Sequence, residues 1–339
     1  MKILPVFSHL APDSWNASNL PHYWTRLAAR SGGRHVPVAD AAEADVYLFL
    51  GNDEPFRDGL HSVVRAHPLV RAAPHRCFAW DFNDRPIGVL PGLYASLPCQ
   101  RSSPRWEAYC YLMQPNPRIE DVYHEQRQPD LLFSFAGAFN ARVRHALPSL
   151  REVPGARILN TTDQPQWFGT SGVDEYSAGY AELLARSQFV LCPRGIGTSS
   201  YRIFETMQMG RVPVILSDNW VTPSGISWES FSVRVPERSV GQLPELLREC
   251  EPRSATMGSL ARRIWEQHFA PAVQLDRVGD AIERIGQRTP PQDLGISRWW
   301  PLQSLEYRRE FWTAQAVAAA ATAKRAVLSR LQRAAPGSA

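Results

Sequence analysis

The chain has 339 residues, of which 44% are hydrophobic and 21% charged, and 37 lysine and arginine residues against 33 acidic ones give a net charge of +4. A chain of this length usually exceeds one hydrophobic core, so two domains are expected. The small, dispersed positive excess lacks the dense basic stripe of a nucleic-acid-binding protein, so no nucleic-acid partner is expected; it is compatible with an anionic small ligand or a membrane surface.

Five cysteines are present, an odd number with no CxxC pair. This usage favours reduced, buried thiols in a cytoplasmic protein and argues against a zinc site. The amino-terminal sequence MKILPVFSHL is typical of a strand, since a signal peptide would need a longer apolar core and a small-residue cleavage site. The sequence contains no run of about 18 uninterrupted apolar residues, so no membrane-spanning helix is expected.

In the first part of the chain, short apolar runs alternate with a helical pattern. Strands are expected at residues 3–8, 44–51 and 76–82, and a helix that ends at glycines is expected at residues 20–32. This order of strand, helix and strand is typical of a parallel sheet covered on both faces. After Asp84, prolines become frequent and the pattern is less regular.

The second part begins after a linker-like segment at residues 126–130 and has the same order. Strands are expected at residues 131–137, 156–162, 188–193, 212–218 and 231–236, and helices at residues 141–150, 175–187, 201–209 and 240–250. The chain therefore divides into an expected first domain at residues 1–127, a second domain at residues 128–290 and a helical tail at residues 291–339. Two α/β domains of this size predict a ligand in the cleft between them, at the carboxyl ends of the strands.

The stretch CPRGIGTSSYRIFETMQMGRVPVILSDNW, residues 192–220, joins an expected strand to an expected helix through a glycine-rich turn. The amino terminus of a helix offers unpaired backbone N–H groups and a partial positive charge. Glycines let the backbone approach a ligand closely, serines donate hydrogen bonds, and arginines add full charges. The residues with these properties, which together suit a diphosphate, are Arg194, Gly195, Gly197, Ser199, Ser200 and Arg202.

Glu205 follows Arg202 by three residues, so both side chains face the same side of the expected helix. The two charges can pair with each other. Alternatively, the carboxylate can accept both hydroxyls of a ribose while the arginine holds a phosphate. The stretch contains neither GxxxxGK(S/T) nor GxGxxG, so its residues alone predict a nucleotide-type anion site and nothing more specific.

With its neighbours, this stretch resembles the exostosin-type glycosyltransferases, family GT47, whose pattern is roughly CPRGxGxxSxRxxExxxxGxxPVIxSDxxxxP. The resemblance covers about residues 131–247, including FSFAGAFNARVRHAL, and is loose over the first 125 residues. It implies an α/β fold of GT-B type, in which two Rossmann-like domains face each other across a cleft and the second holds most of the donor. It also implies an inverting transfer from a nucleotide sugar, a UDP-sugar, with no metal or other cofactor required.

The resemblance assigns roles to individual residues. Arg202 falls where the family contacts the diphosphate and Glu205 where it holds the ribose, and Arg144 and Arg194 are further phosphate candidates. Tyr201 stands where many members have proline. Breaking the bond between sugar and diphosphate places negative charge on the leaving UDP, and preorganised arginines and helix N–H groups can stabilise that charge in place of a metal.

Inversion requires a base, expected in the first domain, that deprotonates the acceptor hydroxyl. The candidates follow expected strands, and each has a turn or capping role as its alternative: His9, Asp13, Asp53, Glu54, Asp81 and Asp84. Asp84 is favoured because the sequence DRPIGVLPGLYAS that begins there is typical of a shaped loop. Asp13 is the second choice, because the nearby Trp15 offers a face on which an acceptor sugar can stack.

These features predict a glycosyltransferase of surface polysaccharide or lipopolysaccharide synthesis that acts on a glycan or lipid-linked saccharide acceptor. Animal and plant members usually carry a Golgi anchor, and none precedes the first expected strand, which favours a bacterial, cytoplasmic protein. The alanine-rich, basic tail at residues 311–333 predicts a surface helix or, alternatively, a peripheral contact with the inner membrane. The alternative function is a catalytically degenerate nucleotide- or glycan-binding scaffold of a polysaccharide-synthesis complex.

Overall fold

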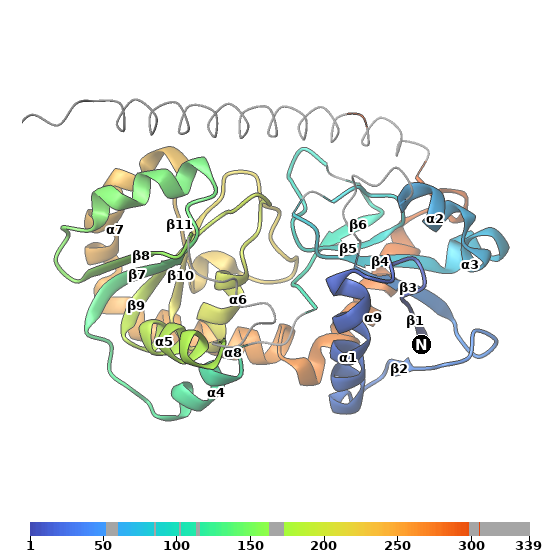
Figure 1. Cartoon of the computed structure of the whole chain (residues 1–339), viewed down its shortest axis with the longest axis horizontal. Coiled ribbons are helices and arrows are strands. Elements are labelled where there is room, and N and C mark those ends of the chain that lie inside the picture. The colour runs from blue at the N-terminus through green and yellow to red at the C-terminus, as the bar shows by residue number, and fades with distance from the viewer. Residues whose placement is uncertain are drawn as a thin grey trace, which may run out of the picture.

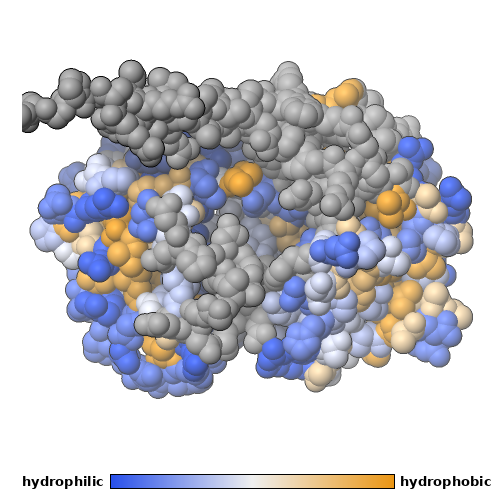
Figure 2. Space-filling view, viewed as in Figure 1, coloured by the Kyte–Doolittle hydropathy of each residue, from blue (hydrophilic) through white to orange (hydrophobic). Residues whose placement is uncertain are grey.

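The computed structural model describes residues 1–51, 60–84, 86–101, 103–112, 116–162 and 173–297, together with Leu305. These residues form two parallel β-sheets, one in each half of the chain, and helices flank both sheets (Figure 1). Hydrophilic side chains cover much of the described surface in the same view, with hydrophobic ones between them (Figure 2). No described helix is both long and apolar enough to cross a membrane.

The first sheet has six strands in the order β2-β1-β3-β4-β5-β6, and every neighbouring pair is parallel. Its strands are β1 (Lys2–Val6), β2 (Val36–Pro37), β3 (Val46–Leu50), β4 (Cys77–Asp81), β5 (Gly92–Tyr94) and β6 (Trp106–Ala108). The three strands expected in this half are confirmed. The additional strands β2, β5 and β6 have two or three residues each, which is too short to leave a pattern in the sequence.

The described helices that belong only to this half are α1 (Trp15–Arg30), α2 (Leu60–Ala66) and α3 (Pro68–Ala72). α1 begins before the expected residue 20 because the Ser14 hydroxyl accepts a hydrogen bond from the Ala17 N–H at 3.0 Å. Such a bond satisfies one of the N–H groups that the first helical turn leaves free.

The second sheet has five parallel strands in the order β11-β10-β9-β7-β8. They are β7 (Leu131–Gly137), β8 (Ala156–Asn160), β9 (Ser187–Pro193), β10 (Val212–Leu216) and β11 (Val233–Arg234). All five expected strands are confirmed. The three central ones, β7, β9 and β10, coincide with apolar runs that are almost entirely buried, as a sheet covered on both faces requires.

Helices surround the second sheet (Figure 1). They are α4 (Pro117–His124), α5 (Val173–Ala185), α6 (Tyr201–Gln208), α7 (Leu243–Cys250) and α8 (Ser254–His268). The α-helix expected at residues 141–150 is instead a 3-10 helix at Arg142–Leu150. Pro148 has no N–H to donate to the carbonyl four residues earlier, which disfavours a regular α-helix there.

The last long helix in the described part of the chain, α9 (Pro271–Arg288), crosses to the first half and packs against α1, β5 and β6. Ion pairs help to fix it there, because the buried Glu107 carboxylate accepts hydrogen bonds from Arg284 at 2.8 Å and from Arg288 at 2.9 Å. Of the expected tail, only residues 291–297 and Leu305 lie within the described part of the chain.

The two halves share an interface that includes backbone hydrogen bonds. The Val221 N–H donates to the Leu97 carbonyl at 3.0 Å, and the indole Nε1 of the buried Trp220 donates to the Ala95 carbonyl at 3.1 Å. A hydrophobic cluster continues from one half into the other. Two parallel α/β domains joined in this way are the arrangement of the GT-B type of fold that the family resemblance implies.

Candidate functional site

A pocket of about 360 Å³ lies between the two halves, a size that suits a small molecule. Asp84 and Tyr111 reach it from the first half, and Tyr176 and Tyr180 line it from α5. The remaining wall consists mainly of residues that follow β7 and β9 and of the first residues of α6, namely Ala138, Asn140, Arg144, Gly195, Ser199, Ser200, Arg202 and Glu205. The pocket therefore lies at the carboxyl ends of the strands, where the alternation of strands and helices predicts it.

α6 starts directly after the glycine-rich turn, with Ser200 at its N-cap position. The Ser200 side chain does not cap the helix, and its hydroxyl is buried without a hydrogen-bond partner in the described part of the chain. Burying an unpaired polar group costs about 1–3 kcal/mol. Together with the partial positive charge at the start of α6, this hydroxyl can bind the oxygens of an anion.

Arg202 extends from the first turn of α6 to the end of β7. Its Nε donates to the Ala136 carbonyl at 2.7 Å, and its guanidinium lies over the Phe135 ring at 5.0 Å. Within the described residues, its two terminal amino groups have no hydrogen-bond partner. Gly137 makes room for them, because a Cβ at that position would lie 2.1 Å from Nη2. A guanidinium that is anchored at Nε and otherwise unpaired is suited to bind an anion.

Glu205 lines the same pocket and is 8% exposed. The Tyr180 hydroxyl donates to its Oε2 at 2.9 Å, and its Oε1 accepts no hydrogen bond from the residues that the structure describes. Burial raises the pKa of Glu205, while the charge of Arg202 and the hydrogen bond from Tyr180 lower it. Although both residues are described, no Arg202 nitrogen lies within 4.0 Å of a Glu205 oxygen, so the alternative in which these two charges pair is not observed.

Arg144 lies beside Arg202 and connects the ends of two strands. Its Nη1 donates to the Ala138 carbonyl at 2.9 Å, and its Nη2 donates to the Pro193 carbonyl at 3.1 Å. Burial, together with the nearby charge of Arg202, lowers the pKa of Arg144 to about 9. Two neighbouring cations create a positive potential in the pocket, which an anionic ligand would relieve.

Most of the predicted site residues line this pocket: Asp84, Arg144, Gly195, Ser199, Ser200, Arg202 and Glu205. Arg194 is not among the lining residues, since its Nε donates to Glu237 at 2.7 Å. The same Glu237 oxygen accepts a hydrogen bond from the Asp218 N–H at 3.3 Å. Arg194 therefore joins the ends of β9 and β10 to the segment after β11.

The two favoured candidates for the base occupy different places. Asp84 lines the pocket and lies close to the glycine-rich turn of the second half, because a Cβ on Gly197 would lie 2.6 Å from Asp84 Oδ1. Asp13 is exposed in the turn before α1 and does not line the pocket. Only Asp84 is thus near the groups that we expect to bind the donor.

The other carboxylates and His9 are also away from the pocket or outside the described residues. Asp81 is buried and accepts a hydrogen bond from the Asn83 N–H at 2.8 Å. With His9 it lines a separate cavity of about 30 Å³. Asp53 and Glu54 lie outside the described residues.

Three tyrosines of the pocket were not singled out from the sequence. Tyr176 and Tyr180 are four residues apart on α5, a spacing that places both on one face of a helix and is visible in the sequence. Tyr111 stacks on Tyr201 across the interface, with ring centroids 3.8 Å apart and planes at 29°. No local pattern identifies Tyr111, because its position depends on how the two halves dock.

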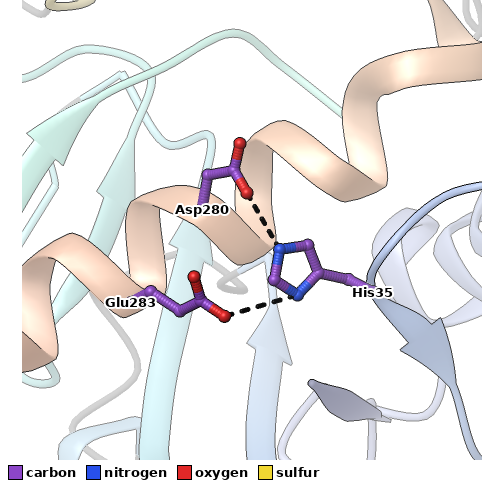
Figure 3. Close-up of side chains that lie close together, drawn as sticks. All are labelled: His35, Asp280 and Glu283. Atoms are coloured by element: carbon purple, nitrogen blue, oxygen red, sulfur yellow. Dashed lines mark hydrogen bonds and ion pairs between the residues drawn. The ribbon is translucent and has the colours of Figure 1, made fainter.

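One group of three potential metal-ligating side chains occurs in the part of the chain that the structure describes: His35, Asp280 and Glu283. The two carboxylates face different nitrogens of the imidazole, with Nε2 2.9 Å from Asp280 and Nδ1 4.0 Å from Glu283 (Figure 3). Arg34 also pairs with both carboxylates. None of these residues lines the pocket, and the group holds α9 against the segment before β2.

Comparison with known proteins identifies relatives of the second half. Residues 108–250 match the family model described as "Exostosin GT47 domain". Over 116 residues, 33% of this chain and 30% of the relative, the sequence is 39% identical to "Exostosin-1 homolog" of Caenorhabditis elegans. Over 114 residues, 33% of this chain and 24% of the relative, it is 37% identical to "Probable glucuronoxylan glucuronosyltransferase IRX7" of Arabidopsis thaliana.

These matches thus span about a quarter to a third of the length of those relatives. Among solved structures, HepE of Anabaena in complex with UDP matches with a TM-score of 0.37 and 11% identity, covering 83% of this chain and 99% of that one. A likeness this low supports no conclusion about a ligand.

Proposed function

We propose, because residues 108–250 match the exostosin GT47 family model, that the chain is an inverting glycosyltransferase that moves a sugar from a UDP-sugar to a glycan or lipid-linked saccharide acceptor. In this reaction an acceptor oxygen forms a bond to the anomeric carbon of the sugar. The bond between that carbon and the β-phosphate oxygen breaks, UDP leaves with the electron pair, and a base takes the acceptor proton.

The observation that carries this proposal is that Arg202 and Glu205 share one pocket without pairing with each other. A guanidinium whose terminal amino groups have no partner among the described residues matches the diphosphate of such a donor, and a buried carboxylate with one oxygen unpaired among those residues matches the ribose hydroxyls. A ligand that lacks either the anionic or the hydroxyl-rich part would leave one of these groups unsatisfied.

The chemistry requires that negative charge on the leaving UDP be stabilised. Arg202 and Arg144 supply positive charge from fixed positions, and the first N–H groups of α6 add a partial charge. Groups that are already oriented need no reorganisation during the reaction. We expect them to act in place of a metal ion.

Asp84 is the base in this proposal, because among the described residues of the first half it is the carboxylate that lines the pocket. The acceptor would then approach from the side of the first half. Asp84→Asn should lower turnover strongly and leave UDP affinity near that of the wild type, and a variant that keeps full turnover would remove Asp84 from this role.

The central test measures UDP affinity by calorimetry and UDP release with a panel of UDP-sugars. Arg202→Ala and Glu205→Ala should each weaken UDP binding by about 1.5–3 kcal/mol, which is about 10- to 150-fold, because each removes a hydrogen bond to a charged group. Arg194→Ala is the matched control: it removes an arginine from the same turn, but one whose side chain pairs with Glu237 outside the pocket. Unchanged UDP affinity in folded Arg202 and Glu205 variants would contradict the site.

Two outcomes of the same experiment separate other functions. A wild-type protein that binds UDP but turns over no donor would support the alternative of a nucleotide-binding scaffold. Tighter binding of GDP or CMP than of UDP would point to a different nucleotide sugar.

The acceptor that we propose belongs to a surface polysaccharide, and the proposed setting is the cytoplasm of a bacterium, at the inner membrane. The expected membrane contact is the basic tail at residues 311–333, which lies outside the described residues. If a protein that lacks residues 311–339 still sediments with anionic vesicles as the full chain does, the tail has no such role.

A further inference from the structure

The Tyr180 hydroxyl makes one of the contacts that determine how the carboxylate of Glu205 is placed. Tyr180 lies near the middle of α5, on a segment separate from the glycine-rich turn, and its hydroxyl donates to Glu205 Oε2 at 2.9 Å. The Glu205 oxygens accept no other hydrogen bond from the described residues. One oxygen is thus held by α5, while the other remains available to a ligand.

We propose that Tyr180 is a positioning residue that makes the pocket selective for ribonucleotides: its hydroxyl holds Oε2 of Glu205 so that Oε1 accepts hydrogen bonds from the ribose. This inference rests on the proposed function, in which a nucleoside diphosphate occupies the pocket. It adds a residue to which neither the sequence nor the family resemblance assigns a role, and it names the part of the ligand that this residue controls.

The first reason is geometric. A carboxylate that is only attached covalently to its own helix can rotate about its side-chain bonds. A hydrogen bond from a second helix favours one orientation of that carboxylate. Arg202 does not provide this restraint, because its Nε is bonded to the Ala136 carbonyl and none of its nitrogens lies within 4.0 Å of Glu205. Of the described side chains, Tyr180 alone supplies a hydrogen bond that restrains Glu205.

The second reason is electrostatic. Burial raises the pKa of Glu205, and the hydrogen bond from Tyr180 opposes that effect together with the charge of Arg202. Among the described residues, Cys192 on β9 and Tyr201 on α6 also interact electrostatically with the carboxylate, and burial raises the pKa of both, so they stay neutral near pH 7. Loss of the Tyr180 hydroxyl therefore shifts Glu205 toward its protonated form, which accepts ribose hydroxyls less well.

The third reason concerns discrimination. A site built to accept a hydroxyl rejects an analogue that lacks it, because the buried acceptor then has no partner in the complex. The discrimination depends on the acceptor being fixed and ionised, and both conditions depend on Tyr180. Inorganic pyrophosphate has no ribose, so its affinity should not depend on the Tyr180 hydroxyl.

The experiment compares dissociation constants for UDP, 2′-deoxy-UDP, 3′-deoxy-UDP and inorganic pyrophosphate in the wild type and in Tyr180→Phe. Tyr176→Phe is the matched control, because Tyr176 lines the pocket one turn earlier on α5 and donates no hydrogen bond to Glu205. Thermal unfolding verifies that each variant is folded. A Tyr-to-Phe change removes only the hydroxyl, so the ring packing is kept.

We expect the wild type to bind UDP about 10- to 100-fold more tightly than at least one of the deoxy analogues, and Tyr180→Phe to lose most of this ratio. Pyrophosphate affinity should stay the same, and UDP affinity of Tyr180→Phe should fall at a higher pH on acidification than that of the wild type. In a Glu205→Gln background, Tyr180→Phe should change the ratio no further, because the two residues act through one contact.

A wild type that binds UDP selectively while Tyr180→Phe keeps the full ratio would overturn this inference and leave the proposed function intact. An equal loss of the ratio in Tyr176→Phe would also overturn it, since the effect would then belong to the helix rather than to the hydroxyl. A wild type that binds no UDP would overturn the proposed function, and this inference with it.

Discussion

Gly137 at the end of β7 offers a direct test of how the pocket is built, because a single methyl group there is aimed at Arg202. A Cβ on residue 137 would lie 2.1 Å from Arg202 Nη2 and 2.8 Å from its Cζ. Ordinary contact begins at 3.4 Å, so Nη2 must move by at least about 1.3 Å, the difference between 3.4 and 2.1 Å. The residue that has to yield is thus the one that we expect to hold the diphosphate.

The same geometry says that the fold should tolerate Gly137→Ala. Gly137 is not among the glycines with positive φ, so alanine can adopt its backbone conformation. Two of the three colliding atoms belong to the far end of the flexible Arg202 side chain, which can move at small cost, and the third is Cζ of the buried Phe135, 2.9 Å from the added Cβ. We therefore expect a folded protein whose unfolding free energy falls by about 1–2 kcal/mol, because a methyl group is added beside a packed ring.

UDP binding should weaken as well, because the displaced Arg202 is the group that we expect to hold the diphosphate. A misplacement of about 1 Å in a positioned group can cost two orders of magnitude, and the loss cannot exceed that of Arg202→Ala if it acts only through Arg202. The expected weakening of UDP binding is about 10- to 150-fold, or about 1.5–3 kcal/mol, by calorimetry.

Two comparisons make the result decisive. Gly179→Ala is the matched control, because Gly179 is exposed on α5 with nothing within 4 Å of an added Cβ; it should bind UDP normally and be slightly more stable. The double variant Gly137→Ala with Arg202→Ala should bind no more weakly than Arg202→Ala alone. Wild-type UDP affinity in Gly137→Ala, or additive losses in the double variant, would refute the reasoning.

Glu205→Gln should make the empty protein more stable near pH 8, because burial raises the pKa of Glu205 and its charge is therefore unfavourable in the folded state. The charge of Glu205 destabilises the folded wild type above the raised pKa, and this effect disappears as pH falls through that pKa. The difference in unfolding free energy between Glu205→Gln and the wild type, measured in urea, should therefore shrink on acidification. A difference that grows instead would show that the surroundings stabilise the charged carboxylate. Gly197→Ala should destabilise the contact between the halves by about 1–3 kcal/mol, since the added Cβ would lie 2.6 Å from Asp84 Oδ1 and 2.8 Å from Asp84 Cα. Urea unfolding tests this against Gly241→Ala, where nothing lies within 4 Å of the new methyl group, and equal midpoints for the two variants would contradict it.

Strands that are long and buried could be predicted from the sequence, and short ones could not. β3 (Val46–Leu50) consists of five consecutive buried apolar residues, a pattern that one chain segment carries by itself. β5 is only three residues long, and it pairs with β4 because Gly92 lets the backbones come together: a Cβ there would lie 2.0 Å from the Ala79 carbonyl oxygen. Such a strand is defined by its neighbour in space, which is not a local property of the sequence.

The candidate site divides in the same way. Arg202 and Glu205 are three residues apart on one helix, so their common direction follows from helical spacing alone. Whether Arg194 faces the ligand depends on Glu237, 43 residues later in the chain, which pairs with it and turns it away from the pocket. The partner of Tyr180, Glu205, likewise lies 25 residues later in the chain and on another helix, so no spacing rule links the two.

The pocket keeps groups in states that a fold selected for stability alone would avoid. Burial and the nearby charge of Arg202 lower the pKa of Arg144, Glu205 is buried with one hydrogen bond from the described residues, and the Ser200 hydroxyl is buried with none from them. Each of these unfavourable states can be relieved by a group on a ligand. An anion neutralises the arginines, a hydroxyl donates to the carboxylate, and an oxygen accepts a hydrogen bond from the serine. A nucleoside diphosphate carries all three, so its binding should relieve the strain at once. At a concentration 100-fold above its dissociation constant it should raise the unfolding free energy by about 2.7 kcal/mol, whereas pyrophosphate or uridine alone at equal concentration should raise it far less.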